Sequence, residues 1–168
     1  MAVFAACVAW RVSKNLLKVE KDRDQQLAAA KHREQAELVF ALGAKLRGRP
    51  ESEAWSIFLV NASSKPIYDV TVHSQHLGTR VKNPPLKLGA LLPGRFIAPS
   101  HPQYKWGPLI DYDRLDEGVE LLLRGKGMKM ITSVEFMDAS RVWWQLLEGT
   151  EICERERFED PNYESFAQ

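Results

Sequence analysis

Residues 54–72, AWSIFLVNASSKPIYDVTV, constrain the fold more than any other stretch of the chain. Residues 55–60 and 68–72 each show a period-2 alternation, and the first segment carries bulky β-forming residues on both faces. This period is typical of β-strands. Residues 61–66 supply the Asn, Ser and Pro of a polar turn. The stretch therefore predicts two strands joined by a turn, at the start of a sheet in a β-sandwich.

Short apolar segments separated by turn residues continue through residues 51–152. They predict further strands at residues 95–98, 119–124, 128–136 and 142–146, and a long connection over 99–118 with one helical turn at 113–117. Six or seven short strands without intervening helices favour a two-sheet sandwich, so the fold class is predicted to be mainly β. Residues 153–168 lack apolar periodicity and predict a flexible tail.

Residues 11–47 predict a long α-helix, so that residues 11–49 form a basic stalk in front of the sandwich. Good helix formers dominate and no proline interrupts them. Leu38, Leu42 and Leu46 share one helical face, and we expect them to pack the last turns on the domain. The polar stretch before them lacks a sustained heptad pattern, which argues against a self-associating coiled coil.

The N-terminal residues 1–10, MAVFAACVAW, carry no charged side chain. They are too few to cross a bilayer, which takes about 20 residues, and they lack the basic start and cleavage site of a secretory signal. Three interpretations remain open: the inner half of a transmembrane helix that begins upstream, a short interfacial anchor, or an apolar helix end packed on a partner. Trp10 followed by Arg11 and Lys14 is typical of a membrane–water boundary.

Charge is unevenly distributed along the chain. The total of +1 predicts no general attraction to nucleic acid. Residues 11–49 hold ten Lys and Arg against five Asp and Glu, a net charge of +5, which leaves −4 for the remainder. If residues 1–10 are a partial anchor in the cell membrane, single-pass or peripheral, this basic excess places the β domain in the cytoplasm. Cys7 and Cys153 lie in unlike segments, and we expect no disulfide between them.

Side chains that could carry chemistry lack the required spacing. The four carboxylates of residues 111–117 do not match a calcium loop and are read as turn and cap residues. His73 and His76 stand three apart on a strand, which directs them to opposite faces. No nucleophile elbow or complete phosphate loop is present. We therefore predict no catalytic, cofactor-binding or metal-binding residues.

Three aromatic residues, Tyr104, Trp106 and Trp143, are predicted to be the most exposed. They could form a surface that binds a protein partner. The alternative is that they pack in the core or in a loop that covers the sandwich.

Three segments together resemble a known group of proteins: EQAELVFA at 34–41, the NASSKPIYDV stretch from Asn61, and VEFMDASRVWWQLLEG at 134–149. The chain is similar to uncharacterised actinobacterial membrane proteins. These have an N-terminal transmembrane helix, an Arg-rich helix with an E-Q-A signature and an immunoglobulin-like β domain. Matching positions are Asn61, Ser63 or Ser64, Pro66, Tyr68, Val70, Phe136, Asp138 and Trp144. Arg141 stands where the group has glycine. The resemblance implies an anchor and an immunoglobulin-like fold, and no reaction.

These observations favour a non-enzymatic, membrane-anchored β-sandwich that binds a protein partner. One alternative is a small-ligand or enzymatic domain with a site in the 99–118 loop, using Asp111, Asp113 or His101, because loops often carry function. Another is a soluble structural subunit of an assembly.

Overall fold

The computed structural model describes residues 18–24, 27, 30, 33–76, 79–122, 129–149 and 151–155. The chain divides into two units between Glu34 and Gln35, and each is described by itself. In the first unit, residues 18–24, 27, 30, 33 and 34 are helical. The apolar segment at residues 1–10 lies outside the described residues. Within the described ranges, no helix has the length and apolar character needed to cross a bilayer.

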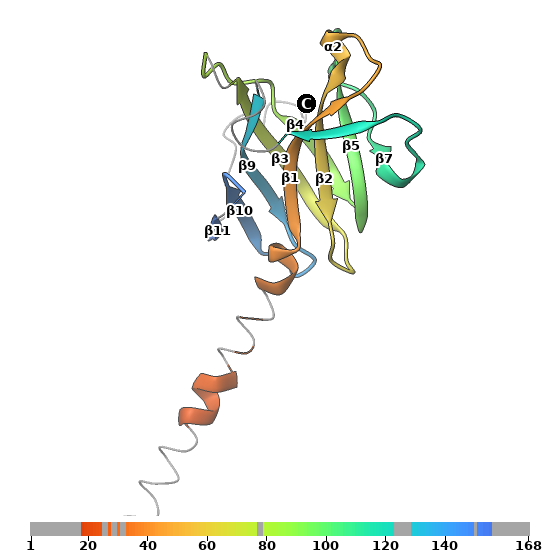
Figure 1. The fold of residues 1–168 in the computed structure, drawn as a ribbon. Helices are drawn as coiled ribbons and strands as arrows, with labels where there is room; N and C mark the ends of the chain where they lie inside the picture. Colours follow the sequence, from red (N-terminus) through yellow and green to blue (C-terminus); the bar gives the residue numbers. More distant parts are fainter. Residues whose placement is uncertain are drawn as a thin grey trace, which may run out of the picture. The chain divides into compact units, whose positions relative to one another are not determined.

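The second unit consists of two layers of antiparallel strands (Figure 1). In sheet A the order is β6-β5-β2-β1-β8, with β7 also paired to β5, and in sheet B it is β11-β10-β9-β3-β4. The strands are β1 (Val39–Leu46), β2 (Trp55–Asn61), β3 (Ile67–His76), β4 (Leu86–Leu91), β5 (Gly94–His101), β6 (Lys105–Trp106), β7 (Ile110–Asp111), β8 (Val119–Leu122), β9 (Lys129–Met137), β10 (Trp143–Leu147) and β11 (Glu151–Arg155). Two short helices accompany them, α2 (Glu51–Ala54) and the 3₁₀ helix η1 (Tyr112–Arg114). The prediction of a mainly β, two-sheet structure is confirmed.

The predicted long helix is wrong over its C-terminal part. Helical residues end at Glu37, and Val39–Leu46 form β1, which pairs with β2 on one side and β8 on the other. An apolar run of this length fits a helical face and a buried strand equally well by periodicity. Gly43 disfavours a helix interior, and pairing on both sides gives the strand its hydrogen bonds. Residues 39–46, assigned to the stalk from sequence, are thus a central strand of sheet A.

The two strands joined by the polar turn at 61–66 belong to different sheets. β2 lies in sheet A beside β1 and β5, whereas β3 lies in sheet B beside β4 and β9. The polar segment therefore crosses from one layer to the other instead of closing a hairpin. β4 to β5 and β8 to β9 are the other places where the chain changes sheets.

Sheet A is packed on both of its faces. The larger core lies between the sheets and includes Ile57 and Leu59 of β2 with Phe136 of β9. On the opposite face of sheet A, Phe58 and Val60 of the same strand belong to a second cluster. This explains why every residue of β2 is buried, as its two apolar faces predicted.

The predicted 99–118 connection is more ordered than expected. It contains the end of β5, then β6, β7 and η1, and its residues Tyr112 and Leu115 pack on the second cluster of sheet A. The segment therefore covers part of that sheet. At the other end, Cys153–Arg155, assigned to a tail from sequence, complete β11, and residues 156–168 lie outside the described residues.

Candidate functional site

Asn61 lies at the centre of a hydrogen-bonded cluster at the junction of the two sheets. Its side chain is fully buried. Its Nδ2 donates to the backbone oxygens of Lys65 (2.9 Å) and Leu91 (3.1 Å). Its Oδ1 accepts from the backbone N–H (3.2 Å) and the hydroxyl (2.7 Å) of Ser63. Both donors and both acceptor positions of the amide are occupied, so Asn61 ties the end of β2 to the end of β4 in the other sheet.

Ser63 extends this cluster within the same turn. Its Oγ lies 2.9 Å from the Lys65 carbonyl oxygen and accepts from the Lys65 N–H at 3.3 Å. Ser63 is 7% exposed, whereas Ser64 is exposed. Of the two serines that could match the resemblance motif, only Ser63 takes part in the cluster.

Gln35, the first residue of the second unit, connects two turns that are distant in sequence. Its Nε2 donates to the Pro66 carbonyl oxygen at 3.3 Å and to Ser63 Oγ at 3.4 Å. Its Oε1 accepts from the backbone N–H of Ala139 at 3.3 Å. These bonds are long and individually weak, but they link the β2–β3 crossover to the β9–β10 turn.

Asp138 organises the β9–β10 turn. The residue is 1% exposed. Its Oδ1 accepts from the backbone N–H groups of Ser140 (2.8 Å) and Val142 (2.9 Å), and its Oδ2 accepts from Trp144 Nε1 (2.9 Å). Three donors compensate for the burial of the carboxyl group. Within this turn Arg141 has φ +65°, the left-handed conformation in which glycine is favoured.

We call Gln35, Asn61, Ser63 and Asp138 the polar clamp. All four lie within the segments that carry the resemblance. Gln35 and Asn61 hydrogen-bond to Ser63, and all four residues hydrogen-bond to backbone groups of the nearby turns, so their role is structural. Residues 61–63 also match the Asn-x-Ser pattern of an N-glycosylation site. The Asn61 nitrogen that would be modified is buried and donates two hydrogen bonds, which disfavours modification of the folded domain.

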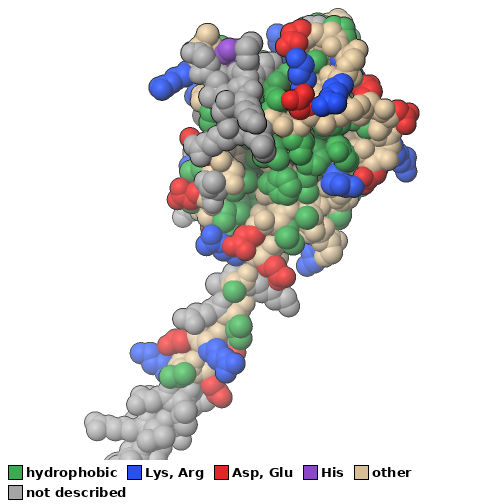
Figure 2. Space-filling view, in the orientation of Figure 1, with side chains coloured by type: hydrophobic (Ala, Val, Ile, Leu, Met, Phe, Trp, Pro, Cys, Tyr) green, Lys and Arg blue, Asp and Glu red, His purple; other side chains and the backbone are tan. Residues whose placement is uncertain are grey.

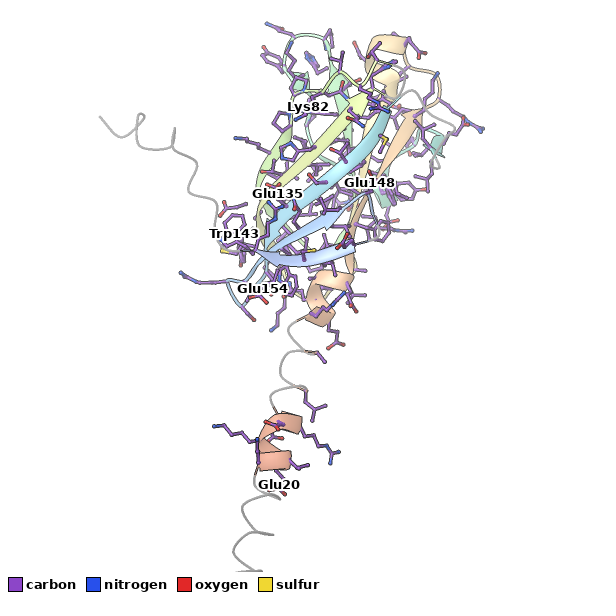
Figure 3. All side chains as sticks on the ribbon, turned by 90° about the vertical axis from the view of Figure 1, so that its left-hand side faces the viewer. Glu20, Lys82, Glu135, Trp143, Glu148 and Glu154 are labelled. Carbon is purple, nitrogen blue, oxygen red and sulfur yellow. The ribbon has the colours of Figure 1, made fainter. Side chains whose placement is uncertain are left out.

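The predicted aromatic surface is divided between the two sheets. Tyr104 is 69% exposed and stacks on His101 with ring centroids 4.9 Å apart. Trp106 is half-buried, packs on Trp55 at 5.3 Å and donates to the Pro84 carbonyl oxygen. Trp143 is half-buried on β10 of sheet B, and in Figure 3 it lies below Glu135. Tyr104 and Trp106 thus share the β5–β6 hairpin, and Trp143 does not join them there.

The loop residues considered for a ligand site have local structural partners. Asp113 forms an ion pair with Arg95, and Asp111 Oδ1 accepts from the Asp113 N–H at 3.0 Å and caps η1. His101 Nδ1 accepts from the backbone N–H groups of Gln103 and Tyr104. Among the residues that the structure describes, no three His, Cys, Asp or Glu side chains are grouped to hold a metal ion.

A two-point ion pair joins the β1–α2 connection to the loop before β8. Arg49 Nε and Nη2 each lie 2.6 Å from a carboxylate oxygen of Glu117. This hydrogen bond, together with the attraction between the charges, holds the pKa of Glu117 below its usual value although partial burial opposes the shift. The same bond raises the pKa of Arg49.

Sequence reasoning missed an apolar surface on the outer face of sheet A. Phe40 and Leu42 of β1 are only half-buried there, and Leu121 of β8 is 41% exposed. Leu121 is opposite Ala44, two residues along β1 from Leu42. Figure 2 shows hydrophobic side chains gathered over β1, β2 and β5. The alternation of Phe40, Leu42 and Ala44 is the sequence signal for this face, but Leu38, Leu42 and Leu46 in the same segment also have helical spacing.

Comparison with known proteins adds no relative: no protein-family model, curated protein or solved structure matches this chain.

Proposed function

We propose that the chain is a non-enzymatic interaction module that holds a β-sandwich at the cytoplasmic surface of the cell membrane and binds a protein partner. The observation that carries the proposal is the sequence of the N-terminus, where an uncharged apolar segment meets Trp10 and Arg11 and is followed by a basic stretch.

We also propose kinship with the actinobacterial membrane proteins and an immunoglobulin-like arrangement of the sandwich. The support is that Gln35, Asn61 and Asp138 come from three separate segments of the resemblance. Asn61 hydrogen-bonds within the β2–β3 crossover, Asp138 within the β9–β10 turn, and Gln35 to both. We expect related domains to share the residues whose hydrogen bonds link these two turns. The buried Trp144, whose Nε1 donates a hydrogen bond to Asp138, belongs to the same pattern.

Membrane fractionation tests the anchor. The full chain is compared with a variant that lacks residues 1–10, both expressed at native level. We expect the full chain to remain in the membrane fraction after carbonate and to be released by detergent, whereas the shortened chain is soluble. A full chain that is soluble without detergent would refute the anchor and favour the subunit of a soluble assembly.

The outer face of sheet A is the surface that we propose for the partner. Neighbouring apolar side chains that stay exposed or half-buried on a folded domain, as Phe40, Leu42 and Leu121 do, are typical of protein-binding surfaces. A photo-crosslinking residue in place of Leu121 should give one discrete adduct with a protein in membranes that contain the full chain. The matched position is the exposed Lys87 on β4 of sheet B, which should give no such adduct. Equal adducts from both positions would contradict the assignment.

A further inference from the structure

β11 forms one edge of sheet B. It pairs with β10 along five residues, from Glu151 opposite Leu147 to Arg155 opposite Trp143. No strand lies on its other side among the described residues. In an edge strand, alternate backbone N–H and C=O groups point outward and can pair with another strand. This edge therefore offers a template for strand addition.

The sequence of β11, Glu-Ile-Cys-Glu-Arg, is complementary to itself in the antiparallel direction. If a second copy pairs with Cys153 opposite Cys153, Glu151 of each copy stands opposite Arg155 of the other. The two-fold symmetry of such a pair produces this contact twice. Opposite charges directly across two antiparallel strands stabilise the pairing.

The three residues that meet in this register share one face of the strand. Glu151, Cys153 and Arg155 are two residues apart, so their side chains stand on the same side of the sheet. Glu151 and Arg155 are exposed and Cys153 is half-buried. The charged ends and the central thiol therefore lie on one accessible surface.

The edge strands β4 and β8 are not complementary to themselves in charge. Antiparallel self-pairing of β4 about its centre sets Lys87 opposite Ala90, and that of β8 sets Glu120 opposite Leu121. Neither arrangement matches a positive with a negative charge. A lysine on an exposed edge, as on β4, is a common feature that discourages pairing.

We propose that two copies of the chain associate through antiparallel pairing of their β11 strands, centred on Cys153. The pairing joins the two B sheets into one continuous sheet and leaves the outer face of sheet A accessible. The interaction does not depend on the proposed membrane anchor, although a shared membrane would raise the local concentration of the copies.

A charge exchange tests the proposal in the full chain, purified in mild detergent and measured by sedimentation equilibrium. Glu151→Arg and Arg155→Glu each place like charges opposite one another, and we expect each to weaken the dimer about tenfold. The double exchange, Glu151→Arg with Arg155→Glu, restores opposite charges and should restore the dimer. A chain that is monomeric throughout, or single variants that dimerise like the original, would overturn the proposal.

Cysteine crosslinking tests the register. In a Cys7→Ser background, two Cys153 thiols form one disulfide, their two protons pass to the buffer, and two copper(II)–phenanthroline complexes each accept one electron. We expect a covalent dimer that disappears with Cys153→Ser. The matched control adds Glu154→Cys to Cys153→Ser, which places the two introduced thiols diagonally and beyond ordinary disulfide reach. Equal yields from the two positions would show random collision and refute the register.

Discussion

At the residue scale, the polar clamp shows how a few side chains fix the junction of two sheets. Asn61 and Asp138 are almost completely buried, and each replaces the water it loses with at least three hydrogen bonds. Removing one partner of such a bond leaves a buried polar group unsatisfied, which costs more than the bond itself contributes. The clamp residues should therefore be more sensitive to substitution than exposed residues in the same turns.

The two adjacent serines of the β2–β3 crossover give a direct test. Ser63→Ala should lower the free energy of unfolding by about 1 to 2 kcal/mol, because Asn61 Oδ1 and the Lys65 N–H lose a partner. Ser64→Ala, at an exposed position, should change it by less than about 0.5 kcal/mol. Urea denaturation of both variants measures the difference. Equal changes in the free energy of unfolding for the two variants would mean that the hydrogen bonds of Ser63 do not contribute to stability.

Arg141 gives the opposite expectation, a substitution that stabilises. It adopts φ +65°, where a side chain with a Cβ is strained and glycine is not. Arg141→Gly should raise the free energy of unfolding by about 0.5 kcal/mol, since relief of strain exceeds the added chain entropy. Ser140→Gly, in the same turn at a residue without positive φ, should not stabilise. Thermal unfolding compares them, and a destabilised Arg141→Gly protein would contradict this account.

At the element scale, the main lesson concerns β1. Its eight residues include four that are less than 4% exposed, Val39, Ala41, Ala44 and Leu46, two on each face of the strand. One face meets the core between the sheets and the other meets the second cluster. A segment that is apolar on both faces is stable only where both faces are packed. Pairing with β2 and β8 along its two edges holds β1 inside the sheet, with one cluster on each face.

The loops at one end of β1 are joined by the Arg49–Glu117 pair, which predicts a pH dependence. Because the folded-state pKa of Glu117 lies below its unfolded value, the pair stabilises the fold at pH values above that unfolded pKa, and the contribution is lost as the pH falls through the folded pKa. Both side chains are partly exposed, so the effect is at most about 1 kcal/mol.

The matched variant for this pair is Glu117→Gln, which keeps the shape and removes the charge. Urea denaturation at pH 7 should show the variant to be less stable than the original chain, and at pH 3 the difference should shrink. Lys45→Gln removes a more exposed pair with Glu51 and should have a smaller effect at both values. A stability difference for Glu117→Gln that is unchanged between pH 7 and pH 3 would argue against the ion pair as its cause.

At the scale of the whole molecule, the folded unit begins before β1. Residues 51–152 are a natural fragment to choose from sequence, but they lack a strand that is paired on both sides. We expect residues 35–155 to unfold cooperatively in a thermal scan followed by near-UV circular dichroism. Residues 51–155 should show no cooperative transition, because the loss of β1 exposes Ile57 and Phe58 on the two faces of sheet A. Cooperative unfolding of the shorter fragment would contradict a central role for β1.

The amino-acid sequence by itself determined where most strands lie. Alternation in 55–60, 68–72, 128–136 and 142–146 and the turn residues between them are local signals, set by the two-residue period of a strand and by the conformational preferences of Asn, Gly and Pro. They predicted the mainly β class and the two-sheet structure. They also marked Asn61 as a turn residue.

Only the tertiary structure decided how these segments are joined. It made 39–46 a strand, placed β2 and β3 in different sheets, and brought Gln35 to Ala139 across 104 residues of sequence. The physical reason is that an apolar run is compatible with a helix or a strand until its neighbours supply hydrogen bonds and a surface to pack on. Those neighbours are distant in the chain, so no local pattern identifies them.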